Sequence, residues 1–189
     1  MLFTYTTDRM ELKILNEENA ALTTEFYGRN REHFSPWEMD HPPEYFTAEY
    51  QRRTLAAESV QYLHSHAVRY YFFLSGYKLP LGTASFTHIE LSPPSCACCR
   101  LGYRLDRDFT GHGYMTEALR FLIPKVFFFY RLHRMEANIL PENANSLRLM
   151  ERLGFMPEGT VRGFAPIGGK YRDHLRYSLL EGDIFPQQR

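Results

Sequence analysis

Hydrophobic and polar residues alternate along several stretches of the chain with a period of two. This period is typical of strands with one buried face, because successive side chains in a strand point to opposite sides. In CCRLGYRL, the alternate side chains from Cys99 to Leu105 would share one face. Gly76 and the Gly168-Gly169 pair mark two hairpins. The expected strands are 9–15, 67–75, 80–90, 98–105, 133–141 and two in the tail from 158 to 183.

A helical period occupies the stretches between these strands. In YMTEALRFLIPKVFFFY, apolar residues recur three and four positions apart, which predicts one buried stripe along a helix. Pro124 lies inside this pattern and is expected to kink the helix or to end its regular part. A proline-rich connection earlier in the chain holds the only tryptophan, Trp37. The expected helices are 17–33, 43–64, 114–130 and 142–154.

These elements follow the order β, α, α, β, β, β, α, β, α, β, β. Mostly antiparallel strands with helices between them predict an α+β or mixed α/β fold. The length of 189 residues fits one domain over 1–189, with enough chain to bury a substantial core.

Charge and hydropathy narrow the classes of function. The formal net charge is zero, so no basic field is available to hold a nucleic-acid backbone. The N-terminal residues lack the pattern of a signal peptide, and no apolar run approaches the roughly 18 residues that cross a bilayer. We therefore expect a cytoplasmic protein that contacts neither nucleic acid nor a membrane directly.

Three cysteines lie close together at Cys96, Cys98 and Cys99. A metal site would need a second ligand pair elsewhere in the sequence, and none is found. Their odd number also argues against a disulfide framework. We expect reduced strand cysteines and no bound metal.

Two glycines, Gly111 and Gly113, precede the long amphipathic helix. A helix N-terminus has unpaired N–H groups and a partial positive charge, so phosphates bind there, and glycine lets them approach the backbone. The amides from Gly111 to Thr116 could therefore hold a diphosphate. The turn lacks the Gly-Lys-Ser/Thr end of a P-loop and the third glycine of a dinucleotide-binding turn.

The strand–helix unit that follows this turn resembles the closing signature of the GNAT superfamily of acyl-CoA-dependent N-acyltransferases. Asn143, Ser146 and the run Leu153-Gly154-Phe155 carry the resemblance. The phosphate turn of that superfamily is similar to TGHGYM, with two departures. Thr110 replaces the usual Gln or Arg, and Met115 replaces the usual Gly or Ala.

The branch that this chain resembles over nearly its whole length is the ribosomal-protein-alanine N-acetyltransferases. The matching segments, in order, are TTDRMEL, RNREHFSPWE, LGYRL, GYMTEAL and GGKYRDHLRYSLL. The resemblance implies the GNAT fold: a mostly antiparallel mixed sheet of about seven strands flanked by helices and splayed at its two parallel central strands. It also implies direct acetyl transfer from acetyl-CoA to an amine, without an acyl-enzyme.

The resemblance further implies which residues hold acetyl-CoA. Turn amides would bind its diphosphate, the splayed strand edge would pair with its pantetheine amide, and Asn143 would contact the pantetheine arm. The implied binding residues are Tyr103, Arg104, Leu105, Gly111, His112, Gly113, Tyr114, Met115, Thr116, Asn143 and Ser146.

Catalysis requires a donor for the leaving thiolate and a base for the amine. Ser146 is the predicted donor, because Met150 occupies the position of the tyrosine that other branches use; alternatively, Ser146 only bonds its own helix.

An α-amine has a pKa of about 8 and a lysine about 10.4, a difference of roughly 3 kcal/mol in the cost of deprotonation, so an α-amine needs only a weak base. Glu136 is a candidate base or a salt-bridged carboxylate, and Tyr103 could hold a water. Glu117 is expected to serve the helix dipole.

Trp37, Glu38 and His174 are the predicted acceptor-binding residues. Trp37 would form a groove wall or a hydrophobic plug, Glu38 would attract a cationic N-terminus, and His174 would line the groove or simply pack. The acceptor is expected to be a protein N-terminus, such as that of a ribosomal protein. A small amine (a polyamine or an antibiotic) and a non-catalytic acyl-CoA-binding domain remain alternatives, and both a monomer and a homodimer are open.

Overall fold

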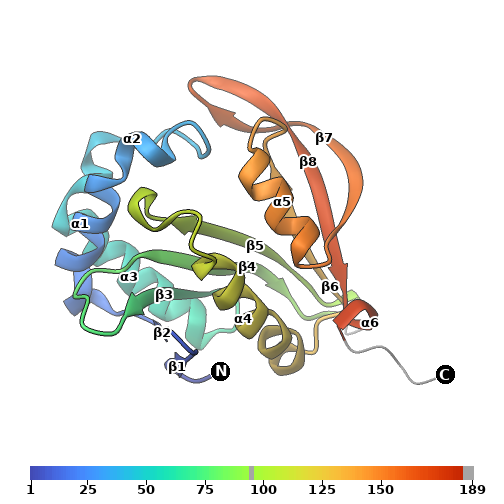
Figure 1. Ribbon diagram of the computed structural model, residues 1–189, viewed down its shortest axis with the longest axis horizontal. Helices are drawn as coiled ribbons and strands as arrows, with labels where there is room; N and C mark the ends of the chain where they lie inside the picture. The colour runs from blue at the N-terminus through green and yellow to red at the C-terminus, as the bar shows by residue number, and fades with distance from the viewer. Residues whose placement is uncertain (94–95, 185–189) are drawn as a thin grey trace.

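A single mixed sheet organises the molecule, as seen in a computed structural model that describes residues 1–93 and 96–184 (Figure 1). Its strand order is β1-β2-β3-β4-β5-β6-β8-β7, and every neighbouring pair is antiparallel except β5 and β6. The strands are β1 (Thr4–Thr6), β2 (Met10–Lys13), β3 (Val68–Leu74), β4 (Gly82–Glu90), β5 (Cys98–Leu105), β6 (Arg134–Ile139), β7 (Met156–Ile167) and β8 (Lys170–Leu180). The mostly antiparallel α/β fold predicted from the sequence is confirmed.

Helices and short 3-10 turns connect and cover these strands. Three α-helices lie between β2 and β3 in the chain, one connects β5 to β6, and one connects β6 to β7. A short α-helix ends the described chain. The α-helices are α1 (Ala20–Arg29), α2 (Arg31–Phe34), α3 (Ala48–Leu63), α4 (Tyr114–Tyr130), α5 (Ala144–Arg152) and α6 (Glu181–Ile184). The 3-10 turns are η1 (Glu17–Asn19), η2 (Pro43–Phe46) and η4 (Arg107–Phe109).

The two faces of the sheet differ in what covers them. On the first face, the apolar stripe of α4 and the inner side of α5 pack on alternate strand residues to form the main core, which includes Phe72, Leu119 and Met150. On the second face, α1 and α3 cover β3 through a smaller cluster that includes Leu55 and Tyr71. Figure 1 shows α4 and α5 on the near side of the sheet.

The central parallel pair separates after a short contact. β5 pairs with β6 only from Cys98 to Arg100, opposite Arg134 to Glu136. Beyond that point the two strands diverge, so residues 101–105 of β5 keep their other neighbour β4 but have no strand on the β6 side (Figure 1). The expected splay at the parallel strands is therefore present, and it leaves backbone groups of β5 free.

Several predicted boundaries are wrong. The sheet has eight strands rather than about seven, because β1 adds to the edge by pairing with β2. The expected helix 17–33 is divided at Asn30, whose backbone leaves the helical conformation between α1 and α2. The expected helix 43–64 begins as the turn η2 before α3. The predicted helix 114–130, in contrast, is confirmed as α4, and Pro124 does not end it.

A short segment after α2 crosses from the helices to the β7–β8 hairpin. We call residues 37–41 the strap. Asp40 of the strap accepts hydrogen bonds from the backbone N–H of Gly168, at 3.2 Å, and of Gly169, at 2.8 Å, at the hairpin tip. The predicted hairpin at this glycine pair is confirmed, and the strap is fastened to it.

No helix in the described part of the chain combines the length and the apolar character that crossing a membrane would require. Within the same residues, no three His, Cys, Asp or Glu side chains are grouped as metal ligands.

Candidate active site

A cleft of about 1700 Å³ opens where β5 and β6 diverge. Its wall combines side chains from both faces of the sheet, so the cleft passes through the splay. Most of the predicted site residues line it: Trp37, Glu38, Tyr103, Arg104, Leu105, Gly111, Gly113, Met115, Thr116, Asn143, Ser146 and His174. Three predicted residues, His112, Tyr114 and Glu136, are not part of the wall.

The glycine turn gives the cleft an exposed row of backbone amides. Gly111 and Gly113 both have φ of +80°, a left-handed conformation that glycine adopts without a steric penalty. Gly113 is the N-cap of α4, and no side chain caps the helix there. A Cβ at Gly111 would meet nothing within 4 Å. The N–H groups of the first turn of α4 are therefore available to an anion.

Arg9, from the loop between β1 and β2, holds this turn in place. Its guanidinium pairs with Glu117 at 2.6 Å, donates to the carbonyl of His112 at 3.0 Å and lies 4.3 Å from the ring centre of Tyr114. Burial raises the pKa of Glu117, but hydrogen bonds from Thr7 and Arg9 outweigh it and lower the pKa overall. Glu117 thus anchors the N-terminal strands to α4, beyond the helix-dipole role expected from the sequence.

A group of arginines near the glycine turn was missed in the sequence. Arg120 of α4 and Arg148 and Arg152 of α5 all line the cleft on this side. Arg148 and Arg152 are four residues apart and so share a helical face, a signal that could have indicated them. The net charge of the whole chain is zero, so it gives no indication of this local group of positive charges.

Ser146 lies in the first turn of α5 with its hydroxyl directed towards Tyr103. The side chain of Asn143, the N-cap of α5, accepts the backbone N–H of Ser146 at 3.1 Å. Other helical hydroxyls, such as that of Ser59, bond a carbonyl of their own helix. In the described structure no such bond is formed by Ser146, and its side chain lines the cleft.

Tyr103 of β5 faces Ser146 across the cleft. Burial raises the pKa of Tyr103 to about 12, although the nearby Ser146 hydroxyl acts in the opposite direction. Within the described residues, the Tyr103 hydroxyl makes no hydrogen bond of normal geometry, and neither does the buried Oδ1 of Asn138 on β6. Unpaired buried polar atoms are uncommon, and both of these line the cleft. They mark places where a bound molecule or water would be held.

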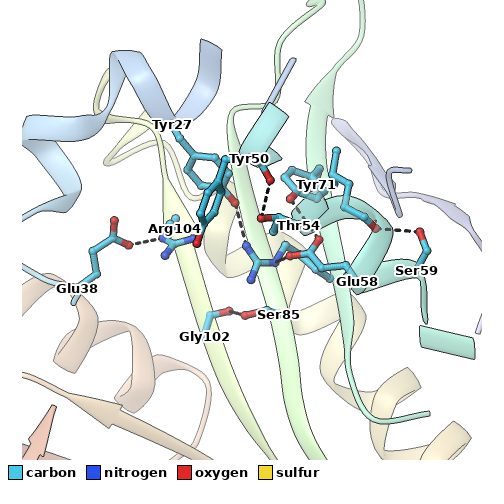
Figure 2. Close-up of polar contacts among 12 residues, drawn as sticks. Tyr27, Glu38, Tyr50, Thr54, Glu58, Ser59, Tyr71, Ser85, Gly102 and Arg104 are labelled. Carbon is cyan, nitrogen blue, oxygen red and sulfur yellow. Dashed lines mark hydrogen bonds and ion pairs between the residues drawn. The ribbon is translucent and has the colours of Figure 1, made fainter. Parts of the chain in front are cut away.

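A network of charges and tyrosines forms the second-face side of the cleft (Figure 2). Arg104 donates to Glu38 at 2.5 Å, and its guanidinium lies 5.2 Å from the ring centre of Tyr27. The Tyr27 hydroxyl accepts a hydrogen bond from Arg69 at 2.9 Å, and Arg69 pairs with Glu58 at 3.1 Å. This network fastens the strap, through Glu38, to β5 and to α1.

Glu38 is therefore already paired. Burial acts to raise its pKa, but the hydrogen bond from His41, the charges of Arg104 and His41 and the hydrogen bond from Arg104 lower it below its usual value. Its carboxylate is ionised and shared between Arg104 and His41, which lies 3.2 Å away. Glu38 lines the cleft as predicted, but it is not a free charge that could attract an amine.

The other predicted residues of this side are placed as follows. Trp37 lines the cleft with 41 % of its surface exposed, so it is a wall rather than a buried plug. His174 of β8 also lines the cleft and is only 5 % exposed. Glu136 lies outside the cleft wall, with its carboxylate 2.9 Å from Arg134 and 3.8 Å from Arg176. These contacts correspond to the salt-bridged alternative for Glu136.

A sheet that splays at its one described parallel pair, beside a glycine turn that opens a helix, is the architecture expected of an acyl-CoA-dependent acyltransferase. The chain belongs to the GNAT acetyltransferase family: residues 9–156 match the family described as "Acetyltransferase (GNAT) domain". The protein is therefore an N-acetyltransferase. Membership of this family argues against the alternative of a non-catalytic acyl-CoA-binding domain.

Individual relatives cover almost the whole chain. It is 30% identical over 184 residues to the [Ribosomal protein uS5]-alanine N-acetyltransferase of Escherichia coli, covering 96% of this chain and 92% of that enzyme. The structure of the ribosomal-protein-S5-alanine acetyltransferase from Vibrio fischeri superposes with a TM-score of 0.89 at 26% identity, covering 95% and 97% of the two chains. Mycobacterium smegmatis RimJ, solved in complex with CoA-disulfide, has the same fold, with a TM-score of 0.86, 22% identity and coverage of 94% and 84%.

Proposed function

We propose that this enzyme transfers the acetyl group of acetyl-CoA to the N-terminal α-amine of a protein, with a ribosomal protein as acceptor. The observation that supports this most is the similarity over 184 residues to an enzyme named for the alanine of ribosomal protein uS5. A cytoplasmic location goes with this proposal, because ribosomes are found there. The charges and free polar atoms of the cleft support the same assignment.

Acetyl-CoA binding is assigned to the first-face side of the cleft. The amides of the first turn of α4 would hold the diphosphate, because they are uncapped and open at Gly111. Arg120, Arg148 and Arg152 add positive charge beside them. The free backbone edge of β5 at 101–105 would pair with the pantetheine arm as an added strand does. Asn143 can contribute its amide nitrogen, while its oxygen already accepts one hydrogen bond as the cap of α5.

Ser146 is assigned as the hydrogen-bond donor to the departing thiolate. Its side chain lines the cleft, and its hydroxyl lies next to that of Tyr103. Met150, at the position of the tyrosine used in other branches, is fully buried in the core and offers no proton. Tyr103, with its unpaired hydroxyl, would hold a water or the thioester end of the donor in line with Ser146.

The acceptor side of the cleft lacks the charge that a polyamine would need. In the part of the chain that the structure describes, the carboxylate lining this side is Glu38, which is shared by Arg104 and His41, and Arg69 is paired with Glu58. Among the described residues of the acceptor side, a polycation would therefore meet no carboxylate without a partner. A peptide N-terminus brings a single amine whose pKa of about 8 leaves a useful neutral fraction near pH 7. This favours an α-amine over a polyamine or a lysine side chain.

Competition between amines of one peptide tests the proposal. A peptide with an N-terminal alanine and one internal lysine is incubated with enzyme and acetyl-CoA, and the site of acetylation is located by fragmentation mass spectrometry. We expect acetyl on the α-amine alone. The matched control is the same peptide with its N-terminus blocked, which should not react. Acetylation of the lysine in the blocked peptide, or faster turnover of spermidine, would contradict the proposal.

A further inference from the structure

The reaction needs a proton acceptor on the second face of the sheet. Tyr103 and Ser146 lie on the first face, with the glycine turn. On β5, Gly102 and Arg104 point to the opposite side, and they pair across the sheet with Ser85 and Thr83 of β4. If the thioester enters from the first face, an amine attacks through the splay from the second. A base for the amine must therefore be sought among cleft residues of the second face.

His174 of β8 lies on that second face. Arg176, two residues along the strand, pairs directly with Asn138 of β6, so both point to one side, and His174 shares that side by alternation. Asn138 and Glu136 are two residues apart on β6, so they point to the same side of the sheet. Glu136 lies opposite Arg100 of the parallel strand β5. His174 lines the cleft and is 5 % exposed, so its ring is held in the wall rather than in solvent.

One hydrogen bond fixes which nitrogen of His174 carries the proton. Nδ1 lies 3.1 Å from the backbone carbonyl oxygen of Arg172. A carbonyl can only accept, so Nδ1 is the donor and carries the hydrogen of the neutral ring. Nε2 is then left with its lone pair, and it has no hydrogen-bond partner among the described residues. The ring of Phe164, 4.9 Å away between centres, packs against the imidazole. This is the arrangement of an oriented base.

The other titratable groups of this side are less suited to the task. Glu38 is held by Arg104 and His41, and Glu136 is outside the cleft wall. His33 also lines the cleft, but no hydrogen bond in the described structure orients its ring. The two arginines nearest His174 on β8 are engaged in ion pairs with other residues. Arg172 pairs with Glu142 at 2.6 Å, and Arg176 lies 3.8 Å from Glu136.

We infer that His174 is the general base of the acetyl transfer, an assignment that rests on the proposed function. The amine nitrogen forms a bond to the thioester carbonyl carbon, and the carbon–sulfur bond breaks, with its electron pair remaining on sulfur. The proton lost by the amine passes to Nε2 of His174, directly or through one water. The thiolate accepts a hydrogen bond from Ser146. The imidazolium then returns its proton to solvent, so the neutral amine and acetyl-CoA give the amide, the thiolate and one proton.

Chemical rescue tests this assignment. His174→Ala removes the base and leaves space for a free imidazole, and general bases typically contribute about 10²- to 10⁴-fold. We expect kcat for the alanine-terminated peptide to fall by about 100-fold, at the low end of that range. Added imidazole should restore a substantial part of it. His174→Gln, which refills the space, should show the same loss without rescue.

The controls separate a chemical role from a structural one. Acetyl-CoA affinity by calorimetry and the thermal melting temperature should stay near the wild-type values in both variants. His64→Ala, at an exposed histidine that ends α3, should keep wild-type kcat with or without imidazole. Wild-type kcat in both His174 variants would overturn the assignment, as would a loss in a folded His174→Ala enzyme that imidazole leaves unchanged. No turnover by the wild-type enzyme on any amine would instead refute the proposed function itself.

Discussion

At the residue scale, Ser146 is the side chain that we propose as the hydrogen-bond donor to the leaving thiolate. Replacing it with alanine removes one hydrogen bond to a charged group, which is typically worth about 1.5–3 kcal/mol. We expect Ser146→Ala to lower kcat by roughly 10- to 150-fold on that basis, with acetyl-CoA affinity almost unchanged. Steady-state kinetics and calorimetry measure the two quantities.

Ser59 offers the matched control for this change. Its hydroxyl also lies in a helix, but it bonds the carbonyl of Leu55 at 3.0 Å, and Ser59 does not line the cleft. Ser59→Ala should leave kcat unchanged. A Ser146→Ala enzyme with the kcat of the wild type would show that the thiolate is stabilised by another group.

Gly113 is a second residue at which a substitution should affect activity, because its backbone conformation favours glycine. Its φ of +80° disfavours any β-branched side chain, and its amide begins the row of N–H groups at α4. Gly113→Val should displace these amides, and losing one charged hydrogen bond of about 1.5–3 kcal/mol would raise the KM for acetyl-CoA at least tenfold. The KM for the peptide should change little.

A glycine without such a requirement provides the comparison. Gly28 lies inside α1, has ordinary helical φ, and a Cβ there would meet nothing within 4 Å. Gly28→Ala should leave both KM values unchanged and raise stability by roughly 0.5–1 kcal/mol. An unchanged KM for acetyl-CoA in Gly113→Val would exclude the glycine turn from the binding site.

At the element scale, Asp106 joins the first helices to the end of β5. It is 1 % exposed, accepts a hydrogen bond from Asn30 at 2.8 Å and pairs with Arg29 at 2.5 Å. Removing one partner of a buried ion pair typically costs about 3–5 kcal/mol, because the other charge stays buried without compensation. We expect Asp106→Ala to lower the free energy of unfolding by about that amount in urea denaturation.

An exposed ion pair calibrates this measurement. Glu49 pairs with Arg52 at 3.2 Å on the surface of α3. Glu49→Ala should cost less than about 1 kcal/mol, the usual value for an exposed pair. If both variants lose stability equally, the buried pair does not hold the helices to β5.

The strap is a second element-scale feature, and two of its side chains fasten it to the sheet. Asp40 binds the hairpin tip, and Glu38 binds β5. Asp40→Ala should release the strap from the hairpin, raising the KM for the peptide while the KM for acetyl-CoA stays constant. Asp183→Ala is the control, because it removes a similar bond to a backbone N–H, that of Leu180, at the other end of β8. A peptide KM unaffected by Asp40→Ala would mean that the strap does not bound the acceptor site.

Elements with strong local patterns could be predicted from the sequence, and those fixed by distant partners could not. The apolar stripe of α4 was sufficient to predict that helix, and the glycine pair at the hairpin tip was sufficient to predict the β7–β8 hairpin. β1 has three residues, two of them exposed, and so lacks a detectable alternation. At the break between α1 and α2, Asn30 bonds Asp106, which is 76 residues away. No local pattern contains such a partner.

The same distinction holds for the site. The glycine turn and Ser146 belong to local motifs and were found in the sequence. Arg69, Asn138 and Arg120 line the cleft only because separate elements bring them together. The pairing of Glu38 with Arg104 likewise depends on the strap reaching β5, so a role as a free charge was predicted where a paired carboxylate is found.

At the scale of the whole molecule, the cleft divides the reaction between the two faces of the sheet. The first face has the amides, the arginines and Ser146, and the second has the strap and His174. The donor and the acceptor can therefore approach from opposite sides and meet at the splay. This arrangement suits direct transfer in a ternary complex, and it gives the acceptor a site whose charges are already paired.

Mass spectrometry of ribosomal proteins is the most direct test of this account. Ribosomal proteins with free N-termini are incubated with the enzyme and acetyl-CoA, and each protein is examined intact and after fragmentation. The account predicts one added acetyl group, located on the N-terminal α-amine of a single protein. Acetyl groups on lysine side chains, or no acetylation of any ribosomal protein by an enzyme that still binds acetyl-CoA, would contradict it.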